Sequence, residues 1–294
     1  MKINKEFIKE GFEIKLLDAA INNLKEQKNV LRFNNFACSI RELSRHILHR
    51  LAPDDEIQRC SWYKPTYNEQ NEITITRGDR VSYAIHGGFD NNQLGLMGLL
   101  ERTKTVKSNL SKTFDLLNKY THINADTFGM SDKETETKAN AVINAFNDFF
   151  EAILSARDTI IKLLEEQIDK KVMEETLYST NSDVDLLATH ASIEEYEIQK
   201  IKIISVTSTN VEIEVYGDIE ARLQYGSDGD LRRDDGFVFN ETFPFCATMQ
   251  APISKKLKHF KIIGEIQFAV DTNSFYEDEI ENVIEEVMTN SISI

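Results

Sequence analysis

Residues 131–178 read SDKETETKANAVINAFNDFFEAILSARDTIIKLLEEQIDKKVMEETLY, and this stretch decides how the chain is organised. Its apolar side chains recur at helical spacing, and neither proline nor glycine interrupts it. Ser131 and Glu134 have the spacing of a capping box at the start of a helix. The stretch therefore predicts one long amphipathic helix, which would connect two domains or form the seam of a dimer.

The residues before this helix predict a helical bundle. Apolar positions recur at helical spacing in several segments, two of which end at Pro53 and at the Gly87–Gly88 pair. The polar segment 54–75 is expected to form an ordered loop. The predicted helices cover 3–30, 33–51, 77–86 and 104–121.

After residue 195 the pattern changes from a helical to an alternating period. Ile219, Ala221 and Leu223 share one face of a short segment in which charged residues alternate with them, as in a half-buried antiparallel strand. Several such strands, separated by Gly and Asp turns, predict a small sandwich or curled sheet, and an acidic helix is expected at 275–288. The predicted class is α+β, with a helical domain 1–130, the connecting helix 131–178, a linker 179–195 and a β-rich domain 196–294.

The composition limits where the protein acts and what it binds. No run of about 18 apolar residues occurs, so no membrane span is expected. The three cysteines are too widely spaced for a disulfide framework or a CxxC metal site, which favours the reducing cytoplasm. No P-loop, GxGxxG or HExxH motif is present, so we expect no cofactor and no catalytic metal of those classes.

The net charge of −15 bears on nucleic acid as a partner. Proteins that hold nucleic acid over a broad face are basic, because Lys and Arg neutralise the phosphates. A broad face of this kind is therefore disfavoured, whereas a local basic cleft that binds RNA or DNA is compatible with the charge.

The segment RELSRHILHR, residues 41–50, provides the first candidate site. Arg41 and His46 have the spacing found in the metal-independent ribonucleases of the HEPN class, which are helical bundles and often dimers. A histidine can take the proton of a ribose 2′-hydroxyl, and a guanidinium can hold the scissile phosphate. His122 is a candidate second imidazole, and the alternative is a polar network beside Glu42. The residues expected to bind substrate around this site are Arg45, His49, Trp62, Lys119 and Tyr120.

The segment YGSDGDLRRDDG, residues 225–236, is the second candidate. Its polar side chains fit either a hairpin loop with internal ion pairs or a site for a hard cation. A magnesium-dependent nuclease would combine Asp230 or Asp235 with Glu265, although Gln267 replaces the lysine that such enzymes use. The charged members of this C-terminal cluster are Asp228, Asp230, Arg232, Arg233, Asp235 and the more distant Glu265.

Four blocks of the sequence resemble a bacterial family of predicted pPIWI-associating nucleases. They are the segment 32–65, ITRGDRVSYAIHGG, LLNKYTHIN, and LQYGSDGDLRRDDG with the following FPF. The resemblance implies a nuclease linked to prokaryotic Argonaute-like or other anti-phage systems. The positions that match are Arg41, His46, His49, Trp62, Arg77, His122, Asp228, Arg232, Arg233 and Asp235.

The leading hypothesis is a nuclease-like effector of a bacterial anti-phage system that cleaves RNA without metal through Arg41, His46 and His122. One alternative is a magnesium-dependent nuclease in the β-rich domain. The other is a non-catalytic sensor or adaptor that binds a defence-system protein through the β-rich domain and dimerises through the long helix. A homo-oligomer is expected under the first and third of these hypotheses.

Overall fold

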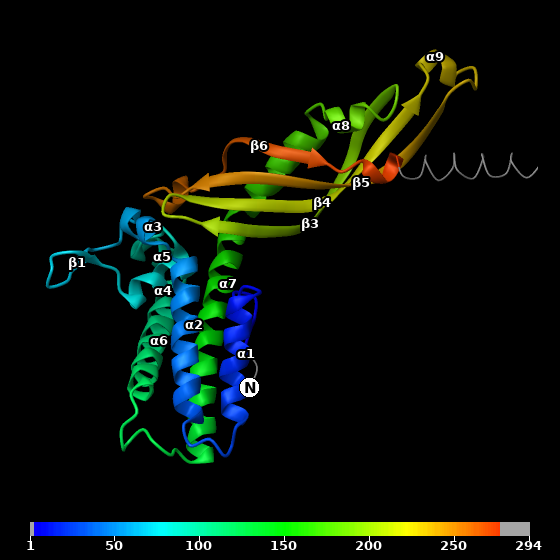
Figure 1. Cartoon of the computed structure of the whole chain (residues 1–294). Helices are drawn as coiled ribbons and strands as arrows, with labels where there is room; N and C mark the ends of the chain where they lie inside the picture. Colours follow the sequence, from blue (N-terminus) through cyan, green and yellow to red (C-terminus); the bar gives the residue numbers. More distant parts are fainter. Residues whose placement is uncertain (1–2, 277–294) are drawn as a thin grey trace, which may run out of the picture. The chain divides into compact units, whose positions relative to one another are not determined.

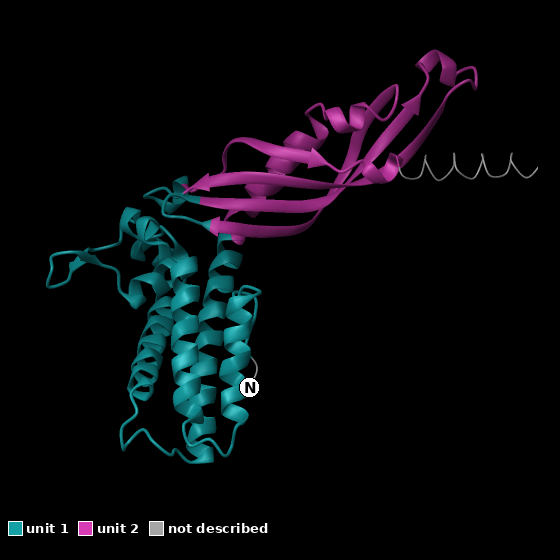
Figure 2. Ribbon diagram, in the orientation of Figure 1, with its two compact units in different colours: residues 1–160, 206–210, 253–259 teal, residues 161–205, 211–252, 260–294 magenta. Residues whose placement is uncertain are grey.

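The structure is a computed structural model, and it describes residues 3–276 (Figure 1). The chain forms two compact units, shown in different colours in Figure 2. Unit 1 contains residues 1–160, 206–210 and 253–259, and unit 2 contains 161–205, 211–252 and 260–294. The predicted α+β class is confirmed, since a helical region, a long helix and a four-stranded antiparallel sheet follow one another along the chain. The acidic helix expected at 275–288 lies almost entirely outside the described residues.

Helices make up most of unit 1, and several differ from the predicted boundaries. Gly11, whose φ of +83° is in the left-handed region, directly precedes α1, so residues 3–11 do not extend that helix. The segment expected to be a loop contains α3, two short strands and the turn that joins them. The elements of this region are α1 (Phe12–Lys25), α2 (Arg32–Leu51), α3 (Asp54–Arg59), β1 (Thr66–Tyr67), β2 (Ile73–Thr74), α4 (Arg77–His86), α5 (Asn91–Leu96) and α6 (Leu100–Thr121).

The predicted long helix is α7, which runs without interruption from Asp132 to Leu177. Its residues up to Ile160 belong to unit 1 and the remainder belong to unit 2, so the two units divide the chain inside α7. Most of the predicted apolar stripe is buried, but Leu163 is 42% exposed. No helix among the described residues is long and apolar enough to cross a membrane.

A close backbone contact fixes the turn between the strands β3 and β4 within unit 1. The Gly88 N–H donates to the Thr207 carbonyl over 2.9 Å, and a Cβ added at Gly88 would lie only 2.0 Å from the Ser208 carbonyl oxygen. The Glu56 carboxylate accepts from the Ser208 N–H over 2.8 Å. Any larger residue at position 88 would therefore clash with the backbone of Ser208, so glycine is needed here for more than ending a helix.

Unit 2 is built around one antiparallel sheet in the order β3-β4-β5-β6. One face of the sheet carries the buried side chains of β4, and the second part of α7 lies along the sheet (Figure 1). Gln167 of α7 accepts a hydrogen bond from the Ile262 N–H over 3.1 Å. The elements of this region are α8 (Ser182–Asp185), β3 (His190–Val206), β4 (Asn210–Tyr225), α9 (Asp228–Leu231), β5 (Phe237–Pro252), η1 (Leu257–His259) and β6 (Ile263–Val270). The range 179–195, expected to be a linker, thus contains α8 and the start of β3.

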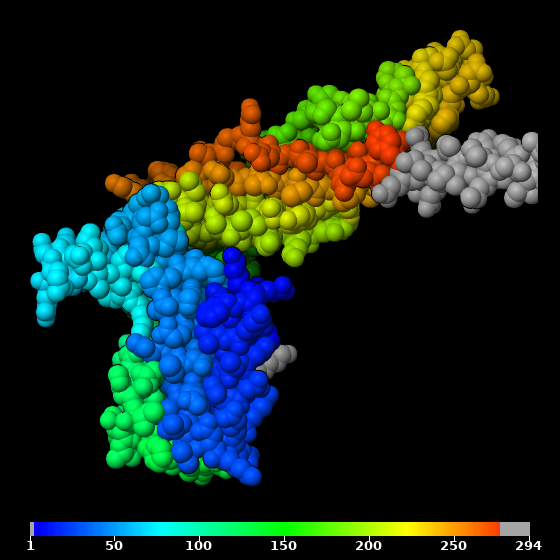
Figure 3. Space-filling model, in the orientation of Figure 1, coloured from blue at the N-terminus to red at the C-terminus, as the bar shows by residue number. Residues whose placement is uncertain are grey.

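Two hairpins project from their units. The β1–β2 hairpin, cyan in Figure 3, extends away from the helices of unit 1. The β4–β5 hairpin of unit 2 carries α9 at its tip (Figures 1 and 3).

A buried histidine links the stability of unit 1 to pH. His86 is 4% exposed, its Nδ1 has no hydrogen-bond partner among the described residues, and its ring packs edge-on against Trp62. Burial, the largest effect, lowers the pKa of His86 to about 4. The unfolded chain, with a histidine pKa near 6.5, therefore binds more protons than the folded chain between about pH 4 and 6.5.

The free energy of unfolding should therefore rise between pH 4 and 6.5 and become level above pH 6.5. At roughly 1.4 kcal/mol for each unit of pKa difference, His86 accounts for up to about 3 kcal/mol of this rise. Urea unfolding across this pH range should show a smaller rise for His86→Gln than for the wild type. The matched control is His190→Gln at an exposed position, and an equal pH slope in all three proteins would contradict the prediction.

Candidate functional site

A cavity of about 660 Å³ lies between α4 and α6 in unit 1, and basic and hydroxyl side chains surround it. Three of the side chains around it are cations: Arg77, Lys104 and Lys107. The cavity is lined by Thr76, Arg77, Gly78, Val81, Lys104, Lys107, Ser108, Ser111, Phe114 and Asp115.

A complete capping box positions the α4 side of the cavity. The Thr76 hydroxyl accepts from the Asp79 N–H over 3.1 Å, and the Asp79 carboxylate accepts from the Thr76 N–H over 3.0 Å. These bonds start the helix at Arg77, so the positive end of the α4 dipole lies at the cavity. A Cβ added at Gly78 would lie 2.7 Å from Cε of Lys107, so the glycine lets that lysine approach α4 closely.

The α6 side of the cavity comes from one face of that helix. Lys104, Lys107 and Ser111 recur at spacings of three and four residues, which places them along a single stripe. The Lys107 ammonium donates to the Ser82 hydroxyl over 3.2 Å, while the Lys104 ammonium pairs with Glu101 over 2.8 Å. Two of the three cations of the cavity thus come from one rigid helix.

Positive charge exceeds negative charge at this cavity. Arg77 stacks over the Phe114 ring at 5.0 Å from Cζ to the ring centre. Within residues 3–276, neither Arg77 nor Lys107 forms an ion pair with a carboxylate. Burial and then the nearby Arg41 guanidinium lower the pKa of Arg77, while Glu42 and Asp115 act in the opposite direction. Burial and the charge of Arg41 thus both disfavour the charged form of Arg77, and a bound anion would favour it.

The structure places Arg41 where its charge acts on Arg77 and where it pairs with Glu42 over 3.6 Å, but it gives the two proposed histidines other neighbours. The Arg41 Nε donates to the Asn118 side chain on α6 over 2.9 Å. His46 packs edge-on against Phe12 of α1, and His122 is exposed just after the last residue of α6. The described contacts do not join Arg41, His46 and His122 to one another.

The residues expected to bind substrate around Arg41 have structural partners. Arg45 pairs with Glu42 over 3.0 Å, and Lys119 pairs with Asp126 over 3.0 Å. Tyr120 is 7% exposed and packs edge-on against Phe33 in the core. His49 is exposed on α2, where burial of its ring, followed by the charge of Arg80, lowers its pKa.

Trp62 is the anchor of a small core. Its Nε1 donates to the Gly87 carbonyl over 2.8 Å, and its ring packs against the buried residues around α3. A tryptophan held in this way at both the ring and the N–H cannot rotate freely to stack on a base, so its position fits an anchoring role.

The C-terminal polar cluster forms a capped turn at the hairpin tip. Ser227 and Asp230 form a capping box for α9, and Arg233 pairs with Asp230 over 2.6 Å and with Asp235 over 3.6 Å. Asp228 accepts from the Gln224 amide over 3.0 Å, and Arg232 is exposed at the end of α9. These contacts match the predicted hairpin loop with internal ion pairs.

Asp235 and Glu265 are too far apart to hold one metal ion. Glu265 lies in β6 between Ile263, which pairs with Gln250 of β5, and Gln267, which pairs with Thr248. Asp235 lies two residues before Phe237, where β5 begins, so more than about 40 Å of extended strand separates the two carboxylates. Among the described residues, no three His, Cys, Asp or Glu side chains gather as metal ligands would.

The sequence contains only a weak signal for the cavity. The segment 104–111 reads KTVKSNLS, with Lys and Ser side chains spaced to share a helix face. Such a stripe also occurs on any solvated helix, and among the residues that line the cavity the family resemblance includes only Arg77.

Comparison with known proteins supports that resemblance over most of the chain. Two family models, both described as predicted pPIWI-associating nuclease, match residues 5–146 and 153–276. No curated protein and no solved structure matches the chain significantly.

Replacing Trp62 with Phe should reduce stability without affecting nucleic-acid binding. The change removes the hydrogen bond from the indole N–H and leaves the Gly87 carbonyl with only the weak Cys60 thiol donor at 3.7 Å, at a cost of about 1–3 kcal/mol. Chemical denaturation measures the loss, and fluorescence anisotropy with labelled RNA measures binding. A variant as stable as the wild type but with weakened RNA binding would assign Trp62 to substrate instead.

Proposed function

The chain belongs to the family of predicted pPIWI-associating nucleases, and on that premise we propose that unit 1 holds a nucleic-acid strand by its phosphates at the cavity between α4 and α6. The observation that carries the proposal is that Arg77 and Lys107 both line this cavity and that neither forms an ion pair within the described residues, although Asp115 also lines it. Both cations would gain their counter-charge from the ligand.

The chemistry of the lining residues fits a phosphodiester. A guanidinium can donate two hydrogen bonds to a phosphate, and serine hydroxyls and a helix N-terminus add further donors. The positive charge of this cavity is local, because the chain as a whole has a net charge of −15. A patch of this size is suited to binding a few nucleotides of a single strand. A long duplex would bring many more phosphates close to acidic surface.

Cleavage without metal remains the proposed reaction, with Arg41 as the group that stabilises the charged phosphate. Its charge acts on Arg77, and contacts with Asn118 and Glu42 orient its guanidinium. His46 and His122 are the proposed acid and base, and they would need RNA to bring them to the same phosphate. RNA is preferred over DNA because its 2′-hydroxyl supplies the nucleophile in this chemistry.

The separate neighbours of His46 and His122 favour a second candidate function, in which the chain binds nucleic acid without cutting it. His46 is held against Phe12 and His122 is exposed at the end of α6. Such an adaptor would present a bound strand to a protein partner. Under either function, the family description leads us to propose a pPIWI protein as that partner, in a bacterial anti-phage system of the cytoplasm.

Arg77→Ala and Lys107→Ala should each weaken binding of a short labelled single-stranded RNA by about tenfold or more, as expected for the loss of a charge-assisted hydrogen bond. Fluorescence anisotropy measures binding at several salt concentrations. The slope of log K against log salt should become shallower by roughly 0.7 for each cation removed.

Lys112→Ala is the matched control for these variants. Lys112 is exposed on the same helix and does not line the cavity, so its loss changes the net charge equally. If Lys112→Ala weakened binding as much as Lys107→Ala, binding would depend on net charge and the proposed site would be wrong.

Cleavage of RNA by the wild type should persist in EDTA, and Arg41→Ala should slow it by about 10²-fold or more, since the guanidinium stabilises charge in the transition state. Gel analysis of end-labelled RNA measures the rate, and a 2′-deoxy substitution at the cleaved nucleotide should block the reaction. His46→Gln and His122→Gln test the acid and base. Tight binding with no cleavage by the wild type would leave the adaptor function.

A further inference from the structure

One edge of the unit 2 sheet is a long strand. β3 runs from His190 to Val206 and pairs with β4 alone among the described strands. Its other side therefore presents backbone N–H and C=O groups along most of its length, which can template pairing with another strand.

The charges along the centre of β3 change sign at one point. Glu195 and Glu197 precede Ile198, and Lys200 and Lys202 follow it. All four charged side chains are exposed, and within the described residues none of them forms an ion pair. The two halves of this segment therefore carry opposite charges, an order that an antiparallel copy of the same strand would match.

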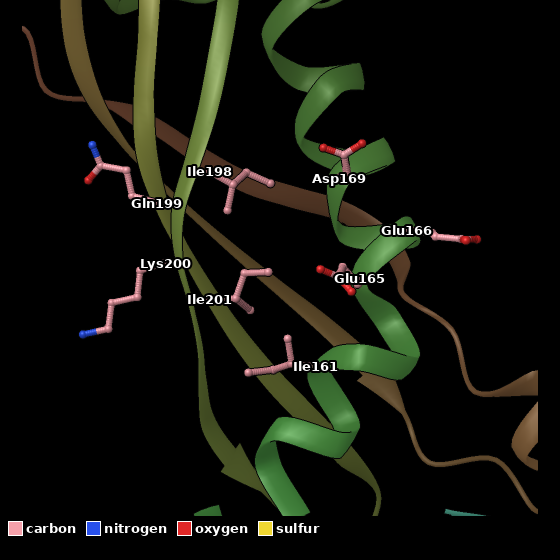
Figure 4. Close-up of a pocket in the computed structure, with 8 residues that line it drawn as sticks. All are labelled: Ile161, Glu165, Glu166, Asp169, Ile198, Gln199, Lys200 and Ile201. Carbon is pink, nitrogen blue, oxygen red and sulfur yellow. The ribbon is translucent and has the colours of Figure 1, made fainter. Parts of the chain in front are cut away.

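The in-and-out alternation of side chains along β3 is interrupted next to Ile198. Ile198 and Ile201 both point toward α7, whereas Gln199 and Lys200 both point away from it (Figure 4). Two consecutive outward side chains break the alternation as a β-bulge does, and we count Gln199 as the extra residue. Counting past this residue, Glu195, Glu197, Lys200 and Lys202 all lie on the outer face of the sheet.

On the inner face, β3 and α7 enclose an open groove of about 590 Å³ (Figure 4). Ile161, Ile198 and Ile201 form its apolar part, and Glu165 and Asp169 of α7 line it as well. A strand added beside β3 would place alternate side chains over this groove.

We propose that a second copy of the chain adds to this edge, with the two β3 strands antiparallel about a two-fold axis at Ile198. Ile198 then lies opposite the partner's Ile198, and one step away Glu197 lies opposite the partner's Lys200. Glu195 lies opposite the partner's Lys202. Each pair occurs twice because of the two-fold symmetry, so four Glu–Lys pairs form on the outer face.

The order of the charges selects a second copy over a basic peptide. A uniformly basic strand would meet Lys200 and Lys202 as well as the glutamates, and like charges opposite one another oppose pairing. An antiparallel copy reverses the order Glu-Glu-Lys-Lys and matches it at every position. The same register also pairs side chains on the inner face. Tyr196 lies opposite the partner's Ile201, and both point toward the groove.

Analytical ultracentrifugation of the full chain across a concentration series tests this interface. The wild type should reach twice its monomer mass of 33.8 kDa, and added salt should weaken the dimer because the charge pairs are exposed. The variant Lys200→Glu/Lys202→Glu places like charges opposite one another and should weaken dimerisation by at least ~10-fold. The variant Glu195→Lys/Glu197→Lys should do the same.

Restoring the complementarity provides the decisive control. An equal mixture of the two double variants should form a heterodimer of twice the monomer mass, because each supplies the charges that the other lacks. A chain with all four substitutions should again dimerise by itself. The proposal fails if the wild type stays at 33.8 kDa throughout the series, if either double variant dimerises as well as the wild type, or if the mixture remains monomeric.

Discussion

One helix supplies apolar side chains to both hydrophobic cores of the molecule. α7 has 46 residues without a Gly or Pro, which corresponds to about 70 Å of helix. Phe149 and Ile153 are buried in unit 1, and Leu164 and Ile168 are buried in unit 2. Neither core is complete without its part of this helix, so the helical spacing of its apolar residues must be kept over the whole length.

The cavity between α4 and α6 depends on positions that are fixed locally. A capping box sets the first residue of α4, and a glycine one position later admits the lysine of α6. The cations thus project from helices and not from a mobile loop, which keeps their separation constant. A small concentration of positive charge of this kind can bind an anion even though the chain as a whole is strongly acidic.

The fold class and α7 could be predicted because long periodic segments carry a strong signal. Shorter elements are harder to predict where one residue supports two interpretations. Pro53 marks the end of α2, yet it also lies directly before the acidic first turn of α3. The Asp90–Gln93 capping box starts a helix of only six residues, α5, which is too short for a clear periodic signal.

The candidate site could not be predicted for a different reason. Arg41 and His46 are five residues apart on a helix, which separates them by roughly 140° around the axis. Arg41 accordingly reaches α6, whereas His46 reaches α1. Arg77 and Lys107 are thirty positions apart in sequence, and only the packing of α4 on α6 brings them together.

Unit 1 is assembled from parts of the chain that the ribosome synthesises at different times. Although its helices come first, unit 1 also includes residues 206–210 and 253–259. Gly87 and Gly88 therefore lack their backbone neighbours until the β3–β4 turn has emerged. The backbone contacts that close unit 1 at this point can therefore form only after much later residues of the nascent chain have been synthesised.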